Sequence, residues 1–338
     1  MEQVERGNAD DPKRSVHMFQ RILVPLDGSL RAEQALPVAA RIARASGSTV
    51  FLVQVISPVI DYSGGMAPVP LMSEQVIESQ MAAATEYLNA IAASEALAGI
   101  ETRTEVSWGQ PALFLLGAVQ SYGIDLAVLC SHGRTGFSRW VLGSVAHALV
   151  HQSTVPVLVL RESEAASLLP RSDEPRTLRA LVPLDGSPLA ETALTPAAHL
   201  VAALAAPAYG ALRLAQVVKP FSTTVAEGFV SELNEEARQR ASTYLAAVAE
   251  RLRESVKGFT LRLTYSVEPG KDVAEALVNL AEQRGGKKEP EGTDACDFIA
   301  MSTHGRGGLE RWVMGSVTER VLTTTKLPML IVRPPKKG

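Results

Sequence analysis

The chain has 338 residues, of which 46% are hydrophobic and 20% charged, and its formal net charge is −3. This length suggests about two domains of ordinary globular composition, each large enough to bury a core. The slightly acidic balance gives no electrostatic reason for nucleic acid or an anionic membrane to be the main partner.

The N-terminal segment and the two cysteines favour a cytoplasmic location. Residues 1–18 are polar and lack the apolar run of a signal peptide, so we expect a flexible N-terminal extension. No run of about 18 apolar residues occurs, which argues against a transmembrane segment. Cys130 and Cys296 sit in apolar runs without metal-ligand spacing, as expected of buried thiols in a reduced, cytoplasmic protein.

The chain contains an internal duplication. The string Leu-Val-Pro-Leu-Asp-Gly-Ser occurs at 23–29 and again at 181–187, and residues 132–145 match residues 304–317 at ten of fourteen positions. A repeat of about 160 residues is far longer than a solenoid repeat, so each copy should be a complete domain. We expect the domains at 19–161 and 178–334, joined by a polar linker at 162–177.

In the first copy, apolar runs of strand length alternate with segments of helical period. The expected strands are 21–26, 49–56, 101–107, 126–130 and 155–160. The expected helices lie near 31–45, 73–97, 111–122 and 144–151. Four of these strands lack polar alternation, as in a parallel sheet with helices on both faces, whereas the third alternates and should be more exposed.

The second copy repeats this order. Its expected strands are 179–184, 212–218, 260–267, 298–301 and 328–332. Its expected helices lie near 189–204, 229–256, 272–283 and 316–324, and a loop rich in Gly, Pro and charge follows residue 283. Each copy is therefore predicted to be an α/β, doubly wound, Rossmann-like domain with a five-stranded parallel sheet in the order 3-2-1-4-5.

The two repeated motifs are expected to meet at one crevice in each domain. Ligands of open α/β sheets bind beyond the carboxyl ends of the strands, where the strand order reverses. Asp27 and Asp185 end the first strand of their copies, and a Gly-rich segment follows each fourth strand. In the predicted order, strands one and four are neighbours that flank this point.

The residue types at the crevice suit a nucleotide. Gly133 and the Gly143-Ser144 pair offer backbone amides with no side chain in the way, and such amides bind phosphate in loops and at helix starts. The Ser144 hydroxyl can serve as a helix N-cap or as a phosphate contact, and Arg134 can add charge. The Asp27 carboxylate can accept hydrogen bonds from ribose hydroxyls.

Structural roles without a ligand remain open for the same residues. The glycines can be turn formers, Ser144 can be a helix cap, and Asp27 can be a turn residue. The repetition alone does not decide, because a duplicated fold also duplicates its turns.

The spacing Gly-x9-Gly-Ser after a Val-Pro-x-Asp-Gly-Ser strand end resembles the universal stress protein family over nearly the whole chain, as two tandem domains. The resemblance implies the adenine nucleotide alpha hydrolase-like fold. It also implies ATP, or AMP or ADP, held with or without Mg²⁺ by backbone amides, with the strand-one Asp near the ribose and residues of strands two and four beside the adenine.

Carried over position by position, the resemblance implies a binding site in each copy. In the first copy it comprises Pro25, Leu26, Asp27, Val55, Cys130, Gly133, Arg134, Gly143, Ser144 and Val145. In the second copy it comprises Pro183, Leu184, Asp185, Val217, Ser302, Gly305, Arg306, Gly315, Ser316 and Val317. Cys130 and Ser302 replace the first glycine of the family pattern, which is tolerated if φ is negative there and not if φ must be positive.

Other conspicuous residues have less to do with the crevice. His132 and His304 have no identifiable catalytic partner, so no catalytic residue is assigned. Trp140 and Trp312 are expected to pack over the loop or in a domain contact. The segment 57–71 is either a lid over the crevice or an ordinary connection.

The tandem arrangement resembling this family implies an intrachain pseudo-dimer formed by the fifth strands, and a homodimer of such chains is compatible with it. Three functional classes stay open: a nucleotide-binding stress or signalling protein, an enzyme of the same fold that is a slow ATP hydrolase or a nucleotide transferase, and a structural or interaction protein without nucleotide. No Walker-type sequence occurs, which disfavours fast hydrolysis.

Overall fold

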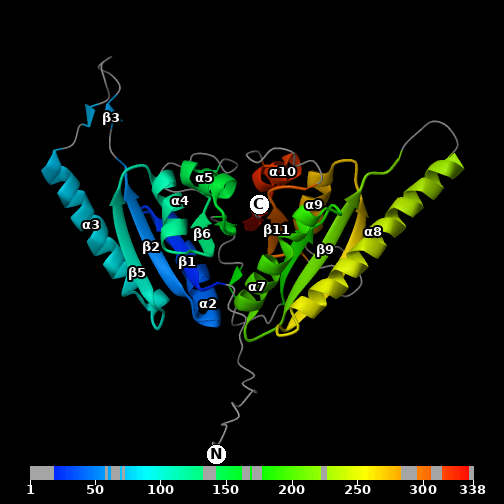
Figure 1. Ribbon diagram of the computed structural model, residues 1–338, viewed down its shortest axis with the longest axis horizontal. Helices are drawn as coiled ribbons and strands as arrows, with labels where there is room; N and C mark the ends of the chain where they lie inside the picture. The colour runs from blue at the N-terminus through cyan, green and yellow to red at the C-terminus, as the bar shows by residue number, and fades with distance from the viewer. Residues whose placement is uncertain are drawn as a thin grey trace, which may run out of the picture.

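The computed structural model describes residues 19–57, 60–61, 69–70, 73–131, 142–161, 168–169, 177–221, 227–282, 295–305 and 314–334. Within these residues, two similar α/β halves lie side by side, and their strands join in one ten-stranded sheet (Figure 1). The strands follow the order β10-β9-β8-β11-β12-β7-β6-β1-β2-β5.

The first half has the predicted order 3-2-1-4-5. Its sheet strands are β1 (Arg21–Leu26), β2 (Thr49–Ile56), β5 (Thr102–Trp108), β6 (Leu126–Cys130) and β7 (Val157–Leu160). Its helices are α1 (Leu30–Glu33), α2 (Ala35–Ser46), α3 (Glu74–Ala92), η1 (Glu95–Leu97), α4 (Pro111–Ser121) and α5 (Ser144–Gln152). A two-stranded hairpin of β3 (Ile60–Asp61) and β4 (Val69–Pro70) lies in the segment for which the sequence indicated only a lid or a connection.

The second half repeats this order. Its strands are β8 (Leu178–Pro183), β9 (Gly210–Val218), β10 (Leu261–Pro269), β11 (Phe298–Ser302) and β12 (Met329–Val332). Its helices are α6 (Pro188–Glu191), α7 (Leu194–Ala205), α8 (Glu227–Ser255), α9 (Val273–Glu282) and α10 (Ser316–Thr324). The doubly wound parallel architecture expected for both copies is therefore confirmed.

The first predicted helix of each copy is broken in two. Ser29 and Ser187 each cap a four-residue helix, their hydroxyls accepting from the amides of Ala32 and Ala190 at 3.2 Å. The short helix α1 ends where the amide of Gln34 bonds to nearer carbonyls than a continuous helix uses. Hydrophobic periodicity does not report this change of hydrogen-bond pattern, so the sequence predicted one helix.

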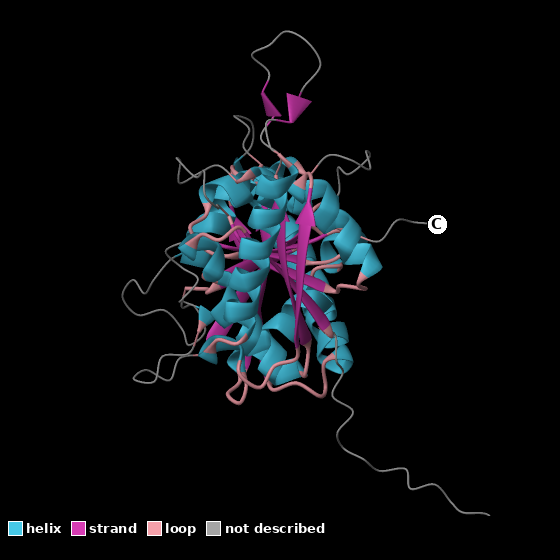
Figure 2. Ribbon diagram, turned by 90° about the vertical axis from the view of Figure 1, so that its left-hand side faces the viewer, coloured by secondary structure: helices cyan, strands magenta, loops and turns pink. Residues whose placement is uncertain are grey.

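Helices cover both faces of the sheet (Figure 2). One core layer packs α2, α3, α7 and α8 against the sheet, and the other packs α4, α5, α9 and α10 against it. Both layers run from one half into the other without a break. The alternating strands β5 and β10 lie at the two outer edges, where burial is least. None of the helices in the described segments is long and apolar enough to cross a membrane.

The fifth strands join the halves. β7 pairs antiparallel with β12, and Leu158 lies opposite Leu330 with both side chains fully buried. This confirms the predicted intrachain pairing. On one side of the junction α2 packs on α7, and Arg41 of α2 donates to the carbonyls of Leu204, at 2.9 Å, and of Ala206.

A pair of arginines bridges the halves on the other side of the junction. Arg161, just after β7, donates to the carbonyl of Leu322 in α10, and Arg333, just after β12, donates to that of His151 in α5 at 2.8 Å. Each guanidinium meets a carbonyl in the last turn of a helix, where the helix dipole is negative. The two contacts are related by the pseudo-symmetry of the copies.

Candidate functional site

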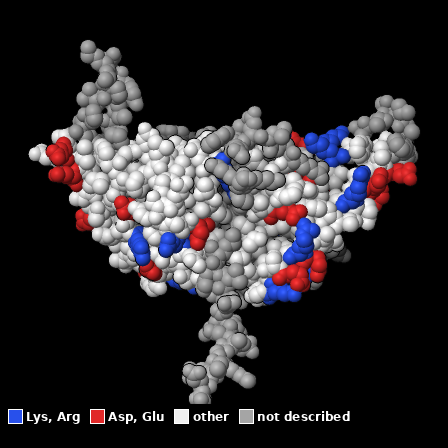
Figure 3. All heavy atoms as spheres, in the orientation of Figure 1, with Lys and Arg blue, Asp and Glu red and all other residues white. Residues whose placement is uncertain are grey.

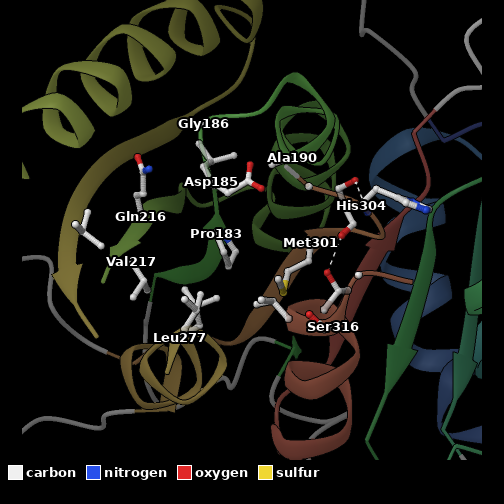
Figure 4. A pocket seen from close by; sticks show the side chains of 18 of the residues that line it. Pro183, Asp185, Gly186, Ala190, Gln216, Val217, Leu277, Met301, His304 and Ser316 are labelled. Carbon is white, nitrogen blue, oxygen red and sulfur yellow. Dashed lines mark hydrogen bonds between the residues drawn. The ribbon is translucent and has the colours of Figure 1, made fainter. Parts of the chain in front are cut away.

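A cavity of about 1490 Å³ opens at the carboxyl ends of β8, β9 and β11 in the second half. It lies where the strand order reverses, with α8 on one face of the sheet and α9 and α10 on the other. Figure 4 shows Asp185, Gln216, Met301, His304 and Ser316 around it. The volume exceeds the roughly 300–1,000 Å³ typical of small-molecule sites.

The predicted residues of the second copy converge on this cavity. Nine of them line it: Pro183, Leu184, Asp185, Val217, Ser302, Gly305, Gly315, Ser316 and Val317. Arg306 lies outside the described residues. Four separate segments of the chain supply these residues, so the sheet topology alone brings them together.

The first copy places its predicted residues at the corresponding points of the fold. Pro25 pairs with Val53 as Pro183 pairs with Ala215, so Val55 and Val217 hold the same register position. Cys130 ends β6, and Ser144 opens α5. Gly133 and Arg134 of this copy lie outside the described residues.

The strand-one aspartates have a turn role. Oδ1 of Asp185 accepts from the amide of Ser187 at 2.9 Å and from its hydroxyl at 2.6 Å. Asp27 makes the same two bonds to Ser29, at 3.0 and 2.6 Å. The intervening glycines, Gly28 and Gly186, have φ of 79° and 85°, a region that favours glycine. The turn interpretation of these aspartates is therefore confirmed.

The other carboxylate oxygen of Asp185, Oδ2, lies against the glycine loop. A β-carbon built on Gly305 would lie 2.2 Å from Oδ2 of Asp185, so a side chain here would require the carboxylate or the loop to move. Because residue 305 is a glycine, the carboxylate of Asp185 can lie in close contact with the loop backbone at the cavity. This is the contact between the two repeated motifs that the sequence predicted.

The helix starts differ from one expectation. The N-cap of α5 is Gly143 and that of α10 is Gly315, so Ser144 and Ser316 are first helical residues and not caps. The amides of Gly143 and Gly315 donate at 2.8 Å to the carbonyls of Ser131 and Thr303, which draws the helix start back to the strand end. A glycine cap has no side chain for the first helical amides, so these amides can receive an anion.

The substituted glycine positions are sterically allowed. Cys130 and Ser302 are the last residues of β6 and β11, where the backbone is extended and a side chain carries no strain. Ser302 is also bonded into the site, because its carbonyl accepts from the hydroxyl of Thr318 at 2.9 Å. The departure from the family pattern therefore leaves the backbone path intact.

The histidine of the loop lines the cavity but is engaged locally. Nδ1 of His304 lies 2.8 Å from the hydroxyl of Thr303. His132, Trp140 and Trp312 lie outside the described residues.

Several lining residues were not predicted. Tyr244 on α8 donates to Glu191 at 2.9 Å, and burial together with this bond raises its pKa. Tyr87 donates to Glu33 at the same distance in the first half. The sequence contains a signal for this pair: aligning the segment of α3 with that of α8 would have shown that Tyr87 and Tyr244 hold equivalent positions.

The cavity of the second half has two basic lining residues. These are Lys219 and Arg240, and Arg240 has a weak exposed ion pair with Glu236 at 4.0 Å. With Val55 matched to Val217 and Tyr87 to Tyr244, the first half has Ser57 and Ala83 at these positions. These two positions therefore carry a basic side chain in the second half and none in the first. Elsewhere on the visible face, basic and acidic side chains lie side by side (Figure 3).

The sequence pattern of the universal stress protein family matches residues 18–161 and 177–333. The chain belongs to this family. Both matched regions coincide with the two halves of the sheet, so this universal stress protein is a tandem member, as the motif spacing predicted.

Relatives agree with this assignment. A universal stress protein of Mycolicibacterium smegmatis is 25% identical over 316 residues, which is 93% of this chain and 97% of the relative. The universal stress protein YxiE of Bacillus subtilis is 28% identical over 148 residues, covering 43% of this chain and all of the relative. A solved universal stress protein from Archaeoglobus fulgidus shares the fold, with a TM-score of 0.62 and 19% identity over 93% of this chain and 98% of the other.

Proposed function

We propose that this universal stress protein binds an adenine nucleotide in the crevice of each half and acts in the stress response or in signalling in the cytoplasm. The observation that carries the proposal is the convergence of nine predicted residues of the second copy on one cavity. Family membership and the repeated geometry in the first half support it.

The cavity has a polar end and an apolar end. Phosphates fit the polar end, where the backbone at Gly305 and the start of α10 can donate to them. Asp185 lines the cavity just beyond the end of β8, so we assign its carboxylate as the acceptor for ribose hydroxyls. Pro183, Val217 and Leu277 form apolar walls for the base. Mg²⁺ would enter with the phosphates, and no residue is assigned to it.

The decisive measurement is mass spectrometry of small molecules released from the purified, denatured chain, followed by titration with ATP and Mg²⁺. We expect about two nucleotides per chain, one for each crevice. One per chain would mean that a copy has lost its site, and none would favour the interaction protein over the nucleotide-binding one. Release of inorganic phosphate from ATP during the titration would identify the protein as a slow ATP hydrolase.

A variant assigns the nucleotides to their sites. Gly143→Val places a branched side chain at the start of α5, so we expect it to remove binding in the first half and to leave the second half intact. Unchanged stoichiometry would contradict the proposed site.

A further inference from the structure

The cavity of the second half has a lining residue from the first half. Among the described residues that line it, His151 is the one that belongs to the first half, and it lies in the last turn of α5. It reaches the cavity because the pairing of β7 with β12 brings α5 beside α10. Ser316 and Glu319, in the first turn of α10, line the same cavity, and the carboxylate of Glu319 approaches His151 to 3.6 Å.

Neighbouring residues fix the position of the His151 ring, but its Nε2 atom makes no hydrogen bond within the described residues. This nitrogen is buried, lies 3.6 Å from Oε2 of Glu319 and has no hydrogen-bond partner in the described part of the chain. The ring stacks on His147 with centroids 4.1 Å apart, and Arg333 holds the backbone carbonyl of His151 at 2.8 Å. A buried polar atom without a hydrogen bond is costly, which favours a role in binding.

The charged groups around the ring have opposing effects. Burial lowers the pKa of His151 first, and His147 and Arg333 lower it further, whereas Glu319 raises it. Without ligand the ring is therefore neutral near neutral pH. An anion placed beside Nε2 would favour the protonated form, because an opposite charge stabilises the imidazolium.

We propose that His151 is a ligand-binding residue of the second crevice, which makes this crevice a composite site of both halves that takes up a proton when a nucleotide phosphate binds. The inference rests on the proposed nucleotide function. It goes further by assigning an additional contact and a coupling between the ligand and the junction of the halves.

The first crevice lacks the equivalent group. Matching Ser144 with Ser316 aligns His151 with Thr323 of α10, which has no titratable side chain. Proton uptake on binding through this position therefore belongs to the second crevice alone.

The sign of the pH effect follows from this coupling. Since the ligand favours the protonated ring, the pKa of His151 is higher in the complex than in the free protein. Affinity at the second crevice then rises as pH falls through these two values. A shift of one pH unit in the midpoint corresponds to about a tenfold change in affinity.

The experiment follows the histidine rings of the full chain by NMR, from pH 5 to 8, without and with saturating ATP, and identifies His151 by the signal lost in His151→Gln. We expect ATP to raise the midpoint of His151 by about one unit. Calorimetry at pH 6 and pH 8 should show one of the two sites binding up to about sixfold more tightly at the lower pH. His151→Gln should remove this difference, apart from the part due to the protonation of ATP itself, which is read from the other site of the same chain.

Thr323→Gln is the matched control, because it places the same side chain at the equivalent exposed position of α10 and leaves His151 and His147 in place. It should retain most of the pH effect. An equal loss in this control, or ATP binding that leaves the midpoint of His151 unmoved, would overturn the inference and leave the proposed function standing. Absence of ATP binding at either site would overturn both.

Discussion

At the scale of single residues, Gly305 joins the two sequence motifs of the second half. A β-carbon there would lie 2.2 Å from Oδ2 of Asp185, whose Oδ1 is already held by Ser187. Gly305→Ala should therefore displace the carboxylate or the loop. We expect it to lower the free energy of unfolding by about 1–3 kcal/mol, as overpacking does, and to weaken nucleotide binding at the second crevice. Urea unfolding and ATP titration measure the two effects.

The matched control is Gly258→Ala, because a β-carbon at Gly258 meets nothing within 4 Å. This substitution should leave both stability and binding nearly unchanged. If Gly305→Ala behaves like the control, the close approach of Asp185 to the loop is not needed for either property.

At the scale of elements, an aspartate ties strand four to strand one in each half. Oδ2 of Asp297 accepts from the amide of Arg179 at 2.7 Å, and Asp125 accepts from the amides of Gln20 and Arg21 at 2.7 and 3.1 Å. Beyond this point β8 and β11 pair over only two residues before they diverge. The carboxylate thus extends a short pairing whose divergence opens the crevice.

Asp297→Ala should leave the buried amide of Arg179 without this partner. We expect the free energy of unfolding to fall by about 1–3 kcal/mol, because an unsatisfied buried donor carries its desolvation cost. Thermal and urea unfolding measure it. Glu254→Ala is the comparison, since its exposed pair with Lys257 should contribute less than about 1 kcal/mol. A similar loss in both variants would argue against a special role of Asp297.

At the scale of the whole molecule, the junction of the fifth strands makes the two halves one body. Leu158 and Leu330 face each other across β7 and β12, are fully buried, and belong to a core layer shared by both halves. We expect each Leu→Ala substitution to lower the free energy of unfolding by about 2–5 kcal/mol. The double variant should lose a different amount from the sum, because contacting residues couple.

Denaturant unfolding followed by two probes, one in each half, would test this coupling. Coincident transitions are expected in the wild-type chain. Independent transitions, or strictly additive losses in the double variant, would mean that the halves are energetically separate.

The sequence by itself determined the duplication, the order of strands and helices, and the residue types at the crevice. These features are local: apolar runs mark buried strands, and Asp-Gly-Ser and Gly-Ser strings mark turns and helix starts. The segments of each site could be named because the parallel topology leaves few arrangements for such an order.

Only the tertiary structure decided how these pieces meet. The approach of Gly305 to Asp185, the caps at Gly143 and Gly315 in place of the serines, and the presence of His151 in the cavity of the other half depend on contacts between distant segments. A periodic pattern carries the direction of a side chain within its own helix or strand. It carries no information about which other segment that side chain will face, because packing of the whole sheet sets those distances.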